Sequence, residues 1–74
     1  METYAELCEA ERLASARYVD ADEAAERAAD ALPKSYKPSN PKYLAFLVAD
    51  SACVRARREL EAARDARVRA EGSR

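Results

Sequence analysis

The chain has 74 residues, two Cys, no His and a formal net charge of −1. A chain this short forms one domain at most, close to the size at which a single hydrophobic core is barely adequate. The lack of His removes the commonest general base and metal ligand, no Cys-x-x-Cys pair suggests zinc, and one Gly leaves no glycine-rich phosphate loop. We therefore expect no enzyme activity, no cofactor, no metal and no small-molecule substrate.

The hydropathy pattern also argues against a membrane protein. The longest uncharged apolar run covers residues 43–49, far short of the roughly 18 residues that a membrane span requires. The N-terminus lacks the basic and then apolar layout of a signal peptide. The sequence thus predicts a cytoplasmic protein with no membrane partner.

A first helix is expected over about residues 4–31. Thr3 followed three residues later by Glu6 is the pattern of a capping box, and Pro33 ends the helix. Residues spaced alternately three and four apart form one face of this helix. That face comprises Tyr4, Leu7, Glu11, Ala14, Tyr18, Ala21, Ala25, Ala28 and Leu32. Because Asp20 with Glu23 also resembles a helix start, a break near Asp20 is an alternative.

A proline-rich loop is expected over residues 32–40 and a second helix over about residues 41–70. Asn40 is a good N-cap, and Pro41 loses no useful hydrogen bond at the first helical position. We expect residues 71–74 to be frayed. The predicted apolar face comprises Tyr43, Phe46, Leu47, Cys53, Val54, Leu60 and Val68. Arg57, Glu61 and Arg64 interrupt its second half.

Two long helices joined by such a loop predict an all-α fold, an antiparallel two-helix hairpin with coiled-coil spacing. Residues 1–31 carry nine acids against three Arg, and residues 44–74 carry seven Arg against five acids. An acidic helix would therefore lie along a basic one. Residue i should face roughly residue 73 − i, which places Cys8 and Cys53 about 18 Å apart along the hairpin. Both thiols are expected to be free, since a disulfide requires Cα atoms within about 7 Å.

The hairpin is expected to self-associate, most simply as a homodimer that forms a four-helix bundle. Ala occurs 18 times and Ile is absent, so two helices alone bury little apolar area. Helix 2 is apolar nearly all round at its start, which is typical of a buried helix. The predicted function is a non-catalytic protein–protein interaction module of a structural, adaptor or regulatory kind. Its expected contact residues are Tyr43, Leu44, Leu47, Val48, Val54 and, more weakly, Leu13.

Two other functions stay open at this point. The loop interleaves Lys and Tyr, a mixture that nucleic-acid-binding surfaces use for phosphates and bases. An accessory protein that binds nucleic acid would use Lys34, Tyr36, Lys37, Lys42, Arg55 and Arg58. Alternatively, the chain is a small phage or host inhibitor that binds a protein target.

Overall fold

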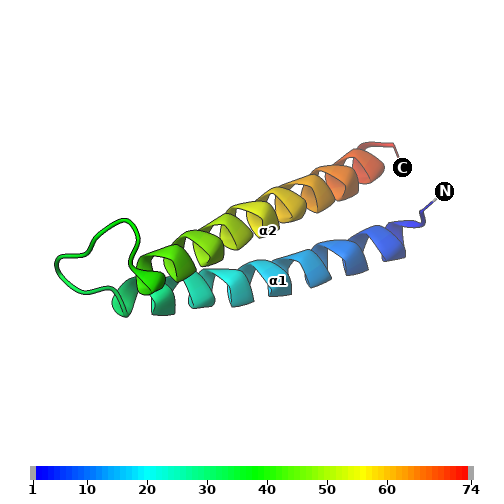
Figure 1. Cartoon of the computed structure of the whole chain (residues 1–74). Helices are drawn as coiled ribbons and strands as arrows, with labels where there is room; N and C mark the ends of the chain where they lie inside the picture. The colour runs from blue at the N-terminus through cyan, green and yellow to red at the C-terminus, as the bar shows by residue number, and fades with distance from the viewer. Residues whose placement is uncertain (1, 74) are drawn as a thin grey trace.

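The computed structural model describes residues 2–73, and two helices contain most of them. Helix α1 spans Tyr4–Asp30 and helix α2 spans Pro41–Gly72. The helices run antiparallel and pack along their whole length, with the loop at one end and both termini at the other (Figure 1). No strand occurs in residues 2–73. The expectation of an all-α chain whose two helices pack against each other is confirmed.

Both helices begin at the caps that the sequence indicates. The Thr3 hydroxyl accepts a hydrogen bond from the Glu6 backbone N–H at 3.1 Å, and the Asn40 side chain accepts one from the Lys42 N–H at 2.8 Å. Each bond satisfies a backbone donor that has no partner within the first helical turn. Pro41 follows Asn40 at the start of α2. The caps therefore fix the first residue of each helix.

Helix α1 has nearly the predicted extent, whereas α2 ends later than predicted. Helix α1 continues without interruption through Asp20, so the possible break is absent. Helix α2 continues to Gly72, about one half-turn beyond the expected end. Glu71 explains this extension, because its carboxylate binds Arg67 at 2.8 Å and also accepts a hydrogen bond from the Tyr4 hydroxyl. Arg74 lies outside the described residues.

The face of α1 that packs on α2 is the one that the spacing predicts. Every member of the series from Tyr4 to Leu32 is buried or half-buried, and Ala14 is the most enclosed at 5% exposure. Four of the nine members are Ala, whose small size lets the two helix backbones approach closely. The same small size means that the contact encloses little apolar area.

The packing face of α2 matches the predicted one in part, since Tyr43, Phe46, Cys53 and Leu60 are half-buried. The buried and half-buried row advances alternately three and four residues, through Phe46, Ala49, Cys53, Ala56, Leu60, Ala63, Arg67 and Ala70. Leu47, Val54 and Val68 each follow a member of this row by one residue, about 100° further round the helix, and they are exposed. The prediction that these three residues belong to the packing face was therefore wrong. It followed the largest aliphatic residues, whereas the seam follows the neighbouring row, in which every second residue is Ala.

Cross-helix contacts define the register of the hairpin. The residue numbers of the partners add up to 75 in Tyr4–Glu71, Glu11–Arg64 and Asp22–Cys53. Residue i thus faces about residue 75 − i, two residues from the expected register. Cys8 then faces residues near 67, about 21 Å along α2 from Cys53. Both cysteines are free, as expected.

A cluster of charged side chains joins the helices near the termini. Glu11 and Arg67 both belong to the packing rows, and they form a salt bridge there. Arg64 lies 3.6 Å from the other Glu11 oxygen. The Arg67 guanidinium, with Arg64 beside it, holds the pKa of the Glu11 carboxyl below its ordinary value. This pairing confirms the expected contact between an acidic and a basic helix.

We expect the Glu11 pairing to make hairpin stability depend on pH. A carboxylate whose folded-state pKa is depressed stabilises the fold above its ordinary value of 4.5, and this contribution is lost as pH falls through the lower folded-state pKa. Glu11→Gln should lower the melting temperature at pH 7 by a few degrees. Its disadvantage should shrink at pH 3. Circular dichroism melts measure both values.

Glu59→Gln is the matched control, because exposed Glu59 makes no salt bridge within residues 2–73. Its melting temperature should follow wild type at both pH values. Equal pH profiles for Glu11→Gln and wild type would show that the cross-helix pair contributes nothing to stability.

Candidate interaction surface

The hairpin leaves most of its large apolar side chains in contact with solvent. Within residues 2–73 only Ala14 and Ala56 are buried, and no larger apolar side chain is. Eight large apolar side chains are exposed by 41–69%. They are Leu13, Val19, Tyr36, Leu44, Leu47, Val48, Val54 and Val68. Two packed helices shield only one stripe of each other, so these positions lie outside the seam.

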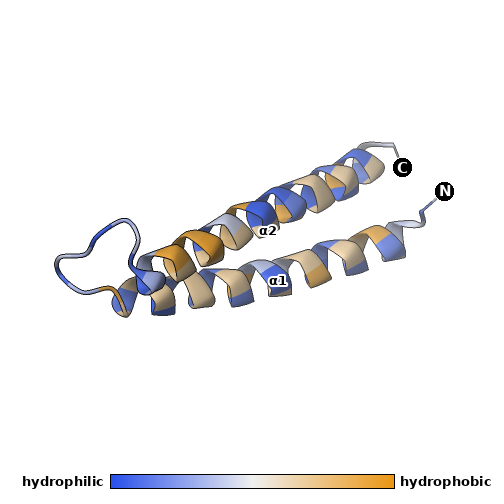
Figure 2. Cartoon of the chain, in the orientation of Figure 1, coloured by the Kyte–Doolittle hydropathy of each residue, from blue (hydrophilic) through white to orange (hydrophobic). Residues whose placement is uncertain are grey.

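The apolar surface is densest where α2 leaves the loop. Figure 2 shows the strongest hydrophobic colouring on the first turns of α2, beside the loop. Leu44, Leu47, Val48 and Val54 are all exposed there. Leu47 and Val54 are seven residues apart and share one side of α2, whereas Leu44 and Val48 lie further round, away from the seam. The predicted contact residues thus occupy two sides of the helix.

Tyr43 is the one predicted contact residue of this segment that is half-buried. Its ring stacks on that of Tyr36, with centroids 4.9 Å apart and planes inclined by 27°. No turn chemistry requires an aromatic side chain at position 36, and this stack supplies the reason for one. Tyr36 holds the loop against the start of α2 and remains 43% exposed.

The predicted anion-binding side chains are exposed but do not form one cluster. Lys34, Lys37 and Lys42 are exposed in or beside the loop, and Arg55 and Arg58 are exposed on α2. Lys42 and Arg55 are 13 residues apart on one helix, which corresponds to about 20 Å. The stacked ring of Tyr36 already has one face against Tyr43. The loop lysines and the two arginines of α2 therefore do not form a single cluster.

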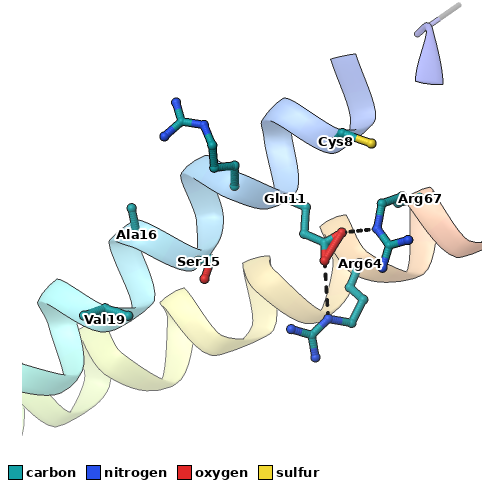
Figure 3. Close-up of a pocket in the computed structure, with 8 residues that line it drawn as sticks. Cys8, Glu11, Ser15, Ala16, Val19, Arg64 and Arg67 are labelled. Carbon is teal, nitrogen blue, oxygen red and sulfur yellow. Dashed lines mark hydrogen bonds and ion pairs between the residues drawn. The ribbon is translucent and has the colours of Figure 1, made fainter. Parts of the chain in front are cut away.

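An open groove of about 510 Å³ lies along one side of the hairpin, toward the termini. Its α1 wall includes Cys8, Ser15 and Val19, and Arg64 and Arg67 reach in from α2 (Figure 3). Glu11 lies between the helices and contacts both arginines. The sequence alone did not predict this groove, because its two walls belong to different helices and come together only in the register of the packed hairpin. Seven-residue spacings are the sequence signal for it: Cys8 to Ser15 on one row and Arg12 to Val19 on the next.

The chemistry of the groove is that of a charged contact surface. Hydrogen bonding to Glu11 and to Tyr4 raises the pKa of the Arg67 guanidinium, which stays protonated. Outside the groove, partial burial and nearby Asp22, 3.7 Å from the sulfur, raise the pKa of the Cys53 thiol. A thiol whose pKa is raised is a weak nucleophile at neutral pH. No three His, Cys, Asp or Glu side chains among residues 2–73 gather to hold a metal ion.

Comparison with models of protein families, with curated proteins and with solved structures gave no match to this chain. Neither described helix is long and apolar enough to span a lipid bilayer.

We expect Tyr36→Ala to destabilise the hairpin, because the stack with Tyr43 is lost. Aromatic pairs contribute about 1 kcal/mol beyond the area that they bury. Urea unfolding at a fixed protein concentration, followed by circular dichroism, measures the change. Tyr36→Phe keeps the ring and should match wild type. If Tyr36→Ala were as stable as wild type, the stack would not anchor the loop.

Proposed function

We propose that this chain is a non-catalytic protein–protein interaction module that associates with itself, as a homodimer with four helices in one bundle. The observation that carries the proposal is the exposure of large apolar side chains combined with the lack of any buried side chain larger than Ala in residues 2–73. Apolar surface in water favours association, and a chain with so small a core gains stability from a partner.

The shape of the chain supports the same proposal. A compact protein of 74 residues has a radius of gyration of about 11 Å, whereas this hairpin has 16.5 Å and measures 54 × 16 × 15 Å. A compact monomer of 8.2 kDa exposes about 4,500 Å², and this chain exposes 5693 Å². The excess is about 1,200 Å², more than the roughly 800 Å² per partner of a standard interface.

The area is also sufficient for a permanent dimer. Two separate hairpins expose about 11,400 Å² together, twice the value for one chain. A compact protein of twice the mass exposes about 7,500 Å². The difference of about 3,900 Å² falls within the range of about 2,000–5,000 Å² that permanent homodimers bury. A helical hairpin pairing with a second one is a common route to such a bundle.

The role that best fits these features is structural, adaptor or regulatory. The exposed side chains are apolar on two sides of α2, and the rest of the surface is a mixture of exposed acids and Arg. Such a surface recognises other helices through packing and through charge pairs at the rim. Location in the cytoplasm belongs to the same proposal.

We expect the double variant Leu47→Asp with Val48→Asp to weaken self-association at least about tenfold, since each carboxylate would have to be desolvated in an apolar contact. Sedimentation equilibrium measures the dissociation constant, and circular dichroism should report largely retained helix. Ala62→Asp adds a charge at an exposed position of α2 outside the proposed contact segment, and it should associate like wild type. An unchanged mass for the double variant would refute the proposed contact segment.

A further inference from the structure

The loop end of the hairpin carries a positive charge that the rest of the chain lacks. All three lysines of the chain are exposed there, and residues 31–49 contain no Asp or Glu. The remaining residues carry ten Arg against 14 acids, a net charge of −4. The nearest acids along the chain are Asp30, the last residue of α1, and Asp50, about 12 Å along α2 from Lys42. We call residues 33–42 the tip.

Two contacts bring lysines of the tip beside an aromatic pair. The rings of Tyr36 and Tyr43 stack with centroids 4.9 Å apart. Lys37 follows Tyr36 in the sequence and Lys42 precedes Tyr43, so the stack draws the two lysine backbones together. The Asn40 N–H donates to the Lys37 carbonyl at 2.9 Å and closes a turn at the same place. The rings and lysines therefore gather where the loop meets α2, at one end of the rod (Figure 1).

The Tyr36 ring is open to an additional stacking partner. One of its faces lies against Tyr43, and the side chain still keeps 43% of its surface exposed. An open aromatic ring beside lysines is the combination that holds single-stranded nucleic acid, because an unpaired base stacks on the ring and the ammonium groups bind phosphates. The N-terminus of α2, the positive end of its macrodipole, lies at the same place.

We propose that the tip binds single-stranded nucleic acid. Tyr36 stacks on one base, and Lys34, Lys37 and Lys42 contact the neighbouring phosphates. The net charge of −4 on the remaining residues repels a polyanion, so the tip is the part of the chain that such a ligand approaches. This role goes beyond self-association and does not depend on it, because the tip precedes the exposed aliphatic side chains of α2.

The composition of the tip favours nucleic acid over an anionic lipid surface. A site on a bilayer needs apolar side chains that enter the boundary between headgroups and acyl chains. Residues 33–42 contain no aliphatic side chain, and the first one of α2 is Leu44. The tip instead adds Ser35, Ser39 and Asn40 to its lysines, and such side chains donate hydrogen bonds to nucleic-acid phosphates.

The experiment titrates a fluorescently labelled single-stranded oligodeoxythymidine with the full chain and follows fluorescence anisotropy. Three phosphate contacts predict a slope of about −2 for the logarithm of the association constant against that of the salt concentration. The double variant Lys37→Gln with Lys42→Gln should flatten this slope by about 1 and weaken binding about tenfold or more. Tyr36→Leu should weaken binding about fivefold or more, because the base loses its stacking partner, whereas Tyr36→Phe should bind like wild type.

Arg17→Gln with Arg69→Gln is the matched control, because it removes the same charge from exposed positions outside the tip. Arg17 lies 13 residues before the end of α1, about 20 Å away, and charges beyond about 10 Å are largely screened at about 0.1 M salt. This control should therefore bind within about twofold of wild type at that salt. Circular dichroism checks the fold of every variant.

Three results would overturn the proposal. They are no binding of the wild-type chain at low salt, an equal loss of binding in the control, and binding to phosphatidylserine vesicles without binding to the oligodeoxythymidine. Equally tight binding to a DNA duplex would overturn the stacking of a base on Tyr36. None of these results changes the mass that sedimentation measures for the chain alone, so failure of the tip and failure of self-association are distinguishable.

Discussion

Two helices can shield only one stripe of each other, and every other feature of this structure follows from that limit. Ala supplies about half of the shared seam, and its large apolar members, such as Phe46 and Leu60, are only half-buried. Small residues let the helices approach closely, but each contributes little buried apolar area. Helix caps and residue spacing thus fix the secondary structure of the chain. Its core, however, is too small to bury the remaining large apolar side chains.

Specific side-chain contacts determine the register of the two helices, which the apolar seam alone does not fix. Ala occupies every second position of the α2 row, and these positions do not select one register strongly, because sliding the helix by a heptad replaces Ala with Ala. The Glu11–Arg67 salt bridge lies within the packing rows, and Tyr4 binds Glu71 near the termini. These contacts pair unlike side chains at defined levels. The Tyr36–Tyr43 stack does the same for the loop. Register therefore depends on a few specific pairs.

The architecture could be predicted because its signals are local. Thr3, Asn40 and Pro41 mark helix starts by their own chemistry, and the spacing from Tyr4 to Leu32 identifies the packing face of α1. The face of α2 could not be predicted in the same way. Its early turns are apolar in nearly every direction, so size favoured Leu47 and Val54, while packing against α1 selected the neighbouring row.

The groove could not be predicted because it depends on register. Arg64 reads as an interruption of an apolar face when α2 is considered alone. Opposite Glu11 it becomes part of a charged wall, and only the packed hairpin shows which residues of α1 stand beside it. The same holds for Tyr36. Its stacking partner, Tyr43, is seven residues further along the sequence, and only the folded loop brings the two rings together.

In the proposed dimer, a second copy of the chain covers the exposed apolar surface. Light scattering of the wild-type chain across a concentration series tests this most directly. We expect a mass of twice the 8.2 kDa of one chain, falling toward the single-chain value only on dilution. A mass of one chain at every concentration would contradict it.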